Sequence, residues 1–454
     1  MNIPLSMPAQ SLIQSVGGER KILYAILLIA ALLRLGAIAE FHSPLISDDK
    51  DYDAIARAVV HGEGYSFEGK PTAYRLPAYP LVLAGTYVLF GERHYPVKLL
   101  QMIFDLASCL LLFAIGKRLF STEVGLVAAA ILAVFPIQIL YVTHLMTETI
   151  FTTIFLLIIW LVVMDGKKSL RIRNDLLLGS MIGFGVLIRS PIGLLPLVIL
   201  LYRWKTGFSG RQVLLSGVAM FFAMFLILSP WLVRNYIEFQ RFTVTSNSGV
   251  NFWIGNHQNA SGSYSFPGTD NPLTAIDDDF QRSEEGVKLA FEFIRAHPVD
   301  EAVIVGKKFA HFFAADYWLM MTMEYRPEWA HPAHAATVFR QLSLSHAVIL
   351  HLPYIAVLLL GTFALICNPR EDEKAFFFLR TLLLYWLAVH LVFFADARYR
   401  FPIVPIFILS AAYGWSMVRE RDWAFTKARA LVLSLICLLY FGGWMGEIAT
   451  LVWQ

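Results

Sequence analysis

The sequence predicts an all-α polytopic membrane protein. Hydrophobic residues make up 57% of the 454 residues and charged residues only 16%, whereas an ordinary soluble domain carries about 25% charged residues. Apolar runs long enough to cross a membrane recur, for example ILYAILLIAALLRLGAIA at 22–39 and VLLSGVAMFFAMFLILSPWLV at 213–233. The net charge of +3 is spread over many loops and forms no basic stripe, which excludes a nucleic-acid-binding protein. The three cysteines lie in apolar runs and predict no disulfide framework.

We expect eleven crossings, with the amino terminus in the cytoplasm. The candidate spans are 22–40, 97–116, 123–141, 149–164, 176–188, 191–202, 212–233, 343–366, 376–394, 401–418 and 429–447. The apolar segment 80–91 is short for a span and is typical of an interfacial helix. If it does not cross, the short basic loops all fall on one side, which the positive-inside rule makes cytoplasmic. If it crosses, the loop at 117–118 is exported, and the later loops disagree with the amino terminus.

The chain is predicted to be one transmembrane domain, 1–454, with two large outer segments. The first outer loop is 41–96 and contains the interfacial segment, and the long outer loop is 234–342. Three shorter polar breaks fall on the same side: THLMTE at 143–148, RSP at 189–191 and ADARYR at 395–400. Five separated segments are therefore expected to converge on one face.

The first outer loop begins with four carboxylates in six positions. Residues 51–61 have the spacing of a short amphipathic helix, with Asp48 and Asp49 just ahead of its first turn. Carboxylates at that place either cap the helix or belong to a site, and the residues alone leave both open. Asp51 and Asp53 are expected to start and solvate the helix.

Arginines at the outer ends of several spans indicate an anion site. Each one costs about 2 to 3 kcal/mol near the membrane unless it is paired or snorkels to the interface. A shared anion explains several of them together, and guanidinium groups suit phosphate. The candidates for a donor phosphate are Arg75, Arg189, Arg234, Arg398 and Arg400. Arg34, inside the first span, is left between snorkelling and phosphate pairing.

Glu148 adds a carboxylate at the outer start of a helix, as a plain first-turn residue or as part of the site. A carboxylate that accepts a proton beside arginines that hold phosphate describes group transfer from a lipid phosphate to a hydroxyl. The segment 245–266 is rich in Asn, Gly and aromatic residues, which suits sugar recognition but is also typical of turns. The candidates for binding the sugar or the acceptor are Tyr74, Asn251, Trp253 and Asn256. The sequence HPAH at 331–334 is not taken as a metal motif.

Several segments together resemble the GT-C glycosyltransferases, specifically the family 39-like membrane proteins related to protein O-mannosyltransferases and lipid A aminoarabinose transferases. They include SDDKDYDAIARAVVHGEGY, TAYRLPAYPLVLAGTYVLFG, GVLIRSPIG, PWLVRNY and ARYRFPIVPI, in the family's order. The resemblance implies a GT-C bundle and an inverting transfer from a polyprenyl-phosphate sugar at the periplasmic face of the bacterial inner membrane. It implies catalytic roles for Asp48, with Asp49 beside it, and for Glu148. Relatives often have a lysine ahead of the juxtamembrane helix, where this chain has Arg75.

The expected function is therefore glycosyl transfer to a glycan, lipid or protein acceptor. A divalent metal is possible at an acidic pair, but a monophosphate donor needs less charge neutralisation, and we expect no metal or other cofactor. Two alternatives are a transporter or flippase, which would place broken or charged helices at the midplane, and an O-antigen polymerase or ligase. The expected partners are the polyprenyl-phosphate donor, the acceptor and membrane lipids.

Overall fold

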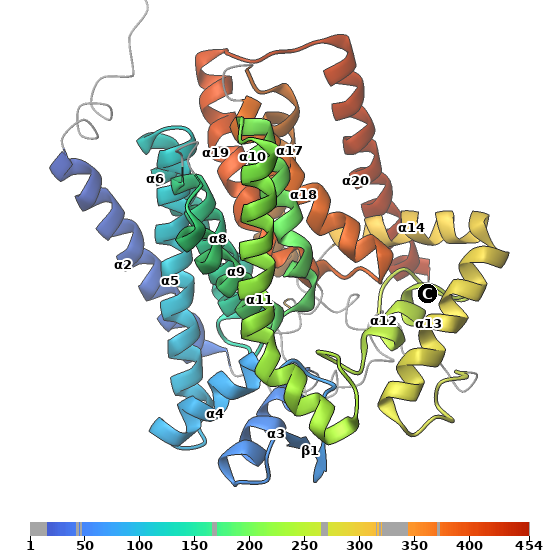
Figure 1. Cartoon of the computed structure of the whole chain (residues 1–454). Helices are drawn as coiled ribbons and strands as arrows, with labels where there is room; N and C mark the ends of the chain where they lie inside the picture. Colours follow the sequence, from blue (N-terminus) through green and yellow to red (C-terminus); the bar gives the residue numbers. More distant parts are fainter. Residues whose placement is uncertain are drawn as a thin grey trace, which may run out of the picture.

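A computed structural model describes residues 16–41, 45, 48–165, 170–264, 271–314, 316, 319, 344–369 and 373–453. Most of these residues are helical, as predicted (Figure 1). Among them, seven helices are long and apolar enough to cross a membrane, and three shorter apolar helices accompany them. The predicted class is confirmed, whereas the count of eleven crossings is not.

Each candidate span falls on one or two helical segments. These helices are α2 (Val16–Glu40), α5 (His94–Leu119), α6 (Thr122–Ala133), α7 (Pro136–Tyr141), α8 (Glu148–Met164), α9 (Ile172–Val186), α10 (Leu195–Thr206), α11 (Gly210–Phe239), α17 (Leu344–Cys367), α18 (Glu373–Val392), α19 (Val404–Glu420) and α20 (Lys427–Trp453). Two 3-10 segments, η1 (Ser190–Leu194) and η4 (Ala397–Ile403), precede α10 and α19.

Close helix packing in the bundle depends on glycines. A Cβ atom placed on Gly179 of α9 would lie 2.2 Å from the carbonyl oxygen of Met220 in α11, and Gly183 is similarly crowded by Met224. Small residues let helix backbones approach when no hydrophobic effect drives them together in lipid. The same pattern holds α5 against α6, where Gly116 faces Gly125.

The expected span 123–141 is broken into α6 and α7 at Val134 and Phe135, before Pro136. The Arg34 guanidinium of α2 donates hydrogen bonds to the two carbonyls that end α6. One nitrogen lies 3.1 Å from the Leu132 carbonyl oxygen, and another donates to the Ala133 carbonyl oxygen. Arg34 is completely buried and pairs with Asp105 of α5 at 2.6 Å. Arg34 therefore neither snorkels nor faces a phosphate, because its guanidinium joins three helices inside the bundle.

The first outer loop forms a compact layer at one end of the bundle (Figure 1). Helix α3 (Asp48–Val60) packs on α4 (Ala78–Phe90), which has only 13 residues and lies across the end of α5 rather than along it. The orientation of α4 supports the prediction that 80–91 does not cross. Helix α3 begins three residues earlier than expected, so that Asp48 and Asp49 lie in its first turn and not ahead of it.

Asp53 does not solvate α3, contrary to expectation. Its carboxylate is buried and accepts hydrogen bonds from Tyr87 of α4 and from Arg57, and it lies 3.0 Å from the ring nitrogen of His94 at the start of α5. The carboxylate therefore ties α3 to the two helices that follow it.

A short hairpin lies between α3 and α4. Strand β1 (Ser66–Phe67) pairs with β2 (Lys70–Pro71) in antiparallel register, Ser66 opposite Pro71. The turn residues Glu68 and Gly69 both have positive φ, 51° and 74°, as a two-residue type I′ turn requires. Beyond β2, residues 72–77 form an arm that returns to the bundle, and Tyr65 donates from its hydroxyl to the carbonyls of Arg75 and Leu76.

The long outer loop contributes three helices toward the same end of the molecule: α12 (Ser248–Gly255), α13 (Asp279–Ala296) and α14 (Pro298–Phe313) (Figure 1). Gly249 and Gly286 let α12 and α13 touch, since a Cβ at Gly286 would lie 2.7 Å from the Gly249 carbonyl oxygen. The HPAH sequence lies outside the described residues.

Candidate active site

Asp48 joins three distant parts of the chain through its carboxylate. Arg75, in the arm before α4, donates to one oxygen at 2.7 Å, and Arg398 of η4 donates to the other at 2.8 Å. Arg75 also donates to Asp51, one helical turn after Asp48, at 2.7 and 3.0 Å. The structure therefore brings together the predicted base and two of the five predicted phosphate ligands.

Glu148 forms a second ion pair beside the first. Arg189, immediately before η1, donates to its carboxylate at 2.7 Å and to the Thr147 hydroxyl at 3.3 Å. Tyr399 lies between the two pairs, because the guanidinium carbons of Arg189 and Arg398 are 5.3 and 5.2 Å from the centre of its ring. These contacts define an outer charge cluster consisting of Asp48, Asp51, Arg75, Glu148, Arg189 and Arg398.

Helix ends and irregular segments present the charges of this cluster. Asp48 and Glu148 are first-turn residues of α3 and α8, where the positive end of the helix dipole favours a carboxylate. Arg189 is extended ahead of Pro191, and Arg398 lies in η4, which Asp396 caps by accepting from the Arg398 backbone N–H. Backbone that does not continue a helix lets these long side chains converge.

Electrostatics keep Asp48 ionised. Burial raises the pKa of Asp48, but the guanidinium groups of Arg398 and Arg75 outweigh burial and hold its pKa well below the usual range. A carboxylate held this way is a weak base until its arginines find another anion.

Asp49 lies beside Asp48 but faces into the protein. Its side chain is buried, and one of its oxygens accepts from the Lys50 backbone N–H at 2.9 Å. It makes no ion pair with the arginines of the outer charge cluster. Its placement fits a supporting role better than contact with a substrate.

Arg234 and Arg400 do not join the outer charge cluster. Arg234 donates to the carbonyls of Thr72 and Tyr65, at 2.8 and 3.0 Å, and so holds the arm that carries Arg75. Arg400 is buried, donates to the Phe312 carbonyl at 3.1 Å and stacks 4.2 Å from the centre of the Tyr354 ring. Neighbouring positions of η4 thus aim Arg398 and Arg400 at different surroundings, which sequence spacing does not reveal.

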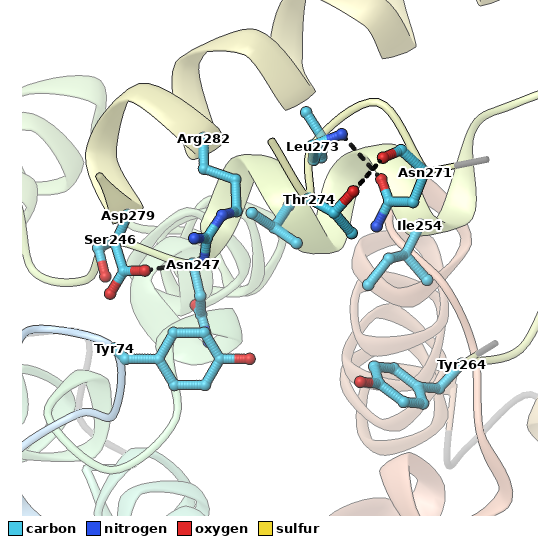
Figure 2. Close-up of a pocket in the computed structure, with 11 residues that line it drawn as sticks. Tyr74, Ser246, Asn247, Ile254, Tyr264, Asn271, Leu273, Thr274, Asp279 and Arg282 are labelled. Carbon is cyan, nitrogen blue, oxygen red and sulfur yellow. Dashed lines mark hydrogen bonds and ion pairs between the residues drawn. The ribbon is translucent and has the colours of Figure 1, made fainter. Parts of the chain in front are cut away.

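A pocket of about 290 Å³ lies next to the outer charge cluster (Figure 2). Tyr74 lies between the two, since its ring lines the pocket and the Arg75 guanidinium is 5.0 Å from the ring centre. The other lining residues come from α12, α13 and the segments around them: Ser246, Asn247, Val250, Ile254, Tyr264, Asn271, Leu273, Thr274, Asp279 and Arg282.

Of the four predicted sugar or acceptor ligands, only Tyr74 lines this pocket. Trp253 is buried and stacks on His257 with ring centres 4.6 Å apart. Asn256 is buried, donates to the carbonyls of Phe252 and Val392, and accepts from Lys308. Asn251 lies in α12 and does not line the pocket. The segment 245–266 contributes several residues to the pocket lining, but the helical phase of α12 presents side chains other than Asn251 and Trp253.

Sequence reasoning missed Asp51, Tyr399, Ser246 and Tyr264. Two signals were available. Asp51 lies three residues after Asp48 and thus on the same face of a helix, and Tyr399 stands between two arginines in DARYR. Ser246 and Tyr264 carry no comparable local signal, because their neighbours at the pocket come from segments distant in sequence.

Among the described residues, no group of three or more His, Cys, Asp or Glu side chains has the arrangement of a metal site. The carboxylates of the outer charge cluster face arginines, which suits an anionic ligand better than a cation. Metal independence stays a prediction.

Comparisons with known proteins agree with this architecture. Residues 70–233 match the family model of dolichyl-phosphate-mannose-protein mannosyltransferases. The fold is similar to AglB, the oligosaccharyltransferase of Archaeoglobus fulgidus. One AglB structure, in complex with an inhibitory peptide and a dolichol-phosphate, is 12% identical with a TM-score of 0.51 over 94% of this chain and 54% of AglB. Another, tethered with an acceptor peptide, is 12% identical with a TM-score of 0.53 over 95% of this chain and 54% of AglB.

ArnT from Cupriavidus metallidurans, bound to undecaprenyl phosphate, is 16% identical with a TM-score of 0.44, over 89% of this chain and 79% of ArnT. No curated protein matches the chain by sequence. This chain spans about half the length of AglB, 54%. The family match and the AglB likeness confirm the predicted resemblance, and the chain has the GT-C fold.

Proposed function

We propose that this GT-C chain is an inverting glycosyltransferase. It moves a sugar from a polyprenyl-phosphate-linked donor to a hydroxyl of a glycan, lipid or protein at the outer face of the bacterial cytoplasmic membrane. The observation that carries the proposal is the Asp48 carboxylate, shared by Arg75 and Arg398 beside a pocket. The family match to dolichyl-phosphate-mannose-dependent transferases supports the donor class.

The donor phosphate replaces Asp48 as the partner of the two arginines. Guanidinium groups bind phosphate through paired, charge-assisted hydrogen bonds. Arg75 and Arg398 keep 17% and 22% of their side chains exposed, which leaves access for a ligand. When the arginines turn to phosphate, the influence that lowers the pKa of Asp48 weakens, and the carboxylate becomes a better proton acceptor.

The transfer then follows as one displacement. The acceptor hydroxyl gives its proton to Asp48, and its oxygen forms a bond to the anomeric carbon from the face opposite the phosphate. The bond between that carbon and the phosphate oxygen breaks, and the electron pair stays on the oxygen of the departing polyprenyl phosphate. Arg75 and Arg398 stabilise this developing charge. Glu148 holds Arg189 close to the same region.

The replacement Asp48→Asn tests the proposal in nanodiscs supplied with a polyprenyl-phosphate sugar. It removes the proton acceptor and keeps the shape, so we expect transfer to fall by about 10²-fold or more with an unchanged melting temperature. Glu284→Gln is the matched control, because Glu284 is 63% exposed in a surface pair with Arg241. Transfer by Asp48→Asn at the level of Glu284→Gln would remove Asp48 from the mechanism.

Orientation is tested separately by cysteine labelling. Lys117 lies at the end of α5 opposite the outer charge cluster and pairs with Glu19 of α2. In a Cys437→Ser background, a Lys117→Cys protein should react with an impermeant thiol reagent only after the cells are opened. Labelling from outside intact cells would reverse the proposed topology.

A further inference from the structure

The pocket beside the outer charge cluster contains polar side chains that the protein does not satisfy. Ser246 is 1% exposed, and its hydroxyl is buried with no hydrogen-bond partner among the described residues. A buried hydroxyl without a partner costs free energy that a ligand recovers. No role for this group follows from the proposed transfer mechanism.

Two phenols flank the same space. Figure 2 shows Tyr74 and Tyr264 on opposite sides of the pocket with their hydroxyl groups directed toward each other. Neither hydroxyl has a hydrogen-bond partner within the described part of the chain. The backbone beside Tyr74 is held by two hydrogen bonds: Ser246 donates from its N–H to the Ala73 carbonyl at 3.0 Å, and Thr245 donates to the Tyr74 carbonyl at 3.1 Å. The backbone that carries Tyr74 and Ser246 is therefore in place before a ligand arrives.

The pocket is lined by both apolar and polar side chains. Val250, Ile254 and Leu273 supply apolar surface, and the tyrosine rings add flat faces. A sugar ring has the complementary character, with C–H faces that lie on apolar and aromatic surface and hydroxyls at its edge. The volume of about 290 Å³ is at the small end of ligand pockets and suits one ring rather than a chain of several.

The charge of the described lining residues is balanced. Asp279 accepts from Arg282 at 3.0 Å, and Arg282 also donates to the Ile276 carbonyl. Among these residues, the pocket thus offers no unpaired charge to an acidic or amino sugar. A charged sugar would leave its own charge without a counter-ion in a partly desolvated space.

We propose that this pocket, formed by Tyr74, Ser246, Asn247, Tyr264 and Asp279, binds a single neutral sugar ring. The inference rests on the proposed function, because Tyr74 places the pocket directly beside Arg75 and hence beside the donor phosphate. A sugar ring reaches this position from two sources, the donor or the acceptor. A sugar ring from either source would present the same groups to the pocket, C–H faces and hydroxyls.

The variants Ser246→Ala and Tyr264→Phe each remove only a hydroxyl. Ser246→Ala keeps the backbone bond to Ala73 and loses no side-chain hydrogen bond, so its melting temperature should equal or exceed that of the parent. Tyr95→Phe is the matched control, since Tyr95 is 55% exposed at the start of α5, away from the pocket lining. Each lost hydrogen bond to a sugar should weaken binding by about tenfold.

Binding in nanodiscs is measured with undecaprenyl phosphate and with its glucose and mannose derivatives. If the donor's ring occupies the pocket, both variants bind undecaprenyl phosphate like the parent and bind the sugar-linked forms about tenfold more weakly. If the acceptor's ring occupies it, donor binding and donor hydrolysis by water are unchanged, and KM for the acceptor rises. Variants that match Tyr95→Phe in all of these measurements overturn the inference.

A second measurement separates this inference from the proposed function. Saturation-transfer NMR with methyl glucoside and methyl mannoside reports contact with the sugar without any phosphate. Signals that the parent gives and that Ser246→Ala weakens support the pocket even if undecaprenyl phosphate fails to bind, in which case the proposed donor is wrong. Normal lipid-phosphate binding without any glycoside signal overturns the pocket and leaves the proposed function standing.

Discussion

The arginines of the bundle interior and those of the outer charge cluster differ in how completely the protein satisfies them. Arg34 is fully buried, and its guanidinium nitrogens donate hydrogen bonds to Asp105 and to the backbone carbonyls of three residues. Arg398 is 22% exposed, and among the described residues its guanidinium donates through one nitrogen, to Asp48. The first arrangement has no capacity for a ligand, whereas the second keeps donors available for one.

The difference distinguishes arginines that stabilise the fold from arginines that remain available to a ligand. The sequence alone does not make this distinction. An arginine bound to backbone carbonyls cannot exchange partners without breaking the fold. An arginine bound mainly to a carboxylate can exchange it for another anion. By this criterion Arg234, which donates to Thr72 and Tyr65 carbonyls, belongs with Arg34 although it lies near the outer face.

The largest expected effect is on the interior pair. Arg34→Met leaves Asp105 buried without its cation and frees the carbonyls that end α6, so we expect a loss of about 3 to 5 kcal/mol in the free energy of unfolding. Thermal unfolding in detergent measures the loss. The double variant Arg34→Met/Asp105→Leu removes both charges and should recover most of it. A double variant no more stable than the single one would contradict a role limited to structure.

In the outer charge cluster the corresponding change should affect catalysis and spare the fold. Arg398→Ala removes a donor from the developing phosphate charge and should lower transfer by about 10²- to 10³-fold. The melting temperature should stay near that of the parent, because the Arg398 side chain is not tied to backbone carbonyls. Kinetics that show a higher KM for the donor, with the acceptor unaffected, would sharpen the assignment. A loss confined to the acceptor would move Arg398 out of the phosphate site.

Asp316 provides an intermediate case, a buried carboxylate that forms no ion pair with any other described residue. Burial raises the pKa of Asp316 to about 6, although Arg400 acts in the opposite direction. An acid with a raised pKa in the folded state contributes stability below its unfolded pKa and loses it as pH rises through about 6. Asp316→Asn should therefore stabilise the protein at pH 8 by about 2 kcal/mol and have little effect at pH 4. Equal effects at both pH values would show that Asp316 does not carry this shift.

Much of the fold follows from the sequence, because each span is a long apolar run with its own signal. The 13-residue length of α4 and the charge of neighbouring loops favour an interfacial position for this helix, which stays a prediction. The break between α6 and α7 was not expected, although Pro136 was visible. Its partner Arg34 lies about a hundred residues away, and the contact depends on how helices pack.

The candidate site was predictable in part, because its charged residues lie near the ends of predicted helices. Asp48, Glu148, Arg75, Arg189 and Arg398 stand at helix ends, and one side of the membrane collects helix ends regardless of packing detail. The direction of each side chain within an irregular segment is set by tertiary contacts. Arg398 and Arg400 therefore separate, and α12 presents Val250 and Ile254 to the pocket in place of Asn251 and Trp253.

The central claim is that Asp48 holds Arg75 and Arg398 before the donor binds and gives them up to its phosphate. Binding of undecaprenyl phosphate to the parent, Asp48→Ala and Arg398→Ala proteins in nanodiscs tests it most directly. Without the competing carboxylate, Asp48→Ala should bind the lipid phosphate about tenfold more tightly than the parent while failing to transfer sugar. Arg398→Ala should bind it more weakly than the parent. Unchanged or weaker binding by Asp48→Ala would contradict the exchange of partners on which the mechanism depends.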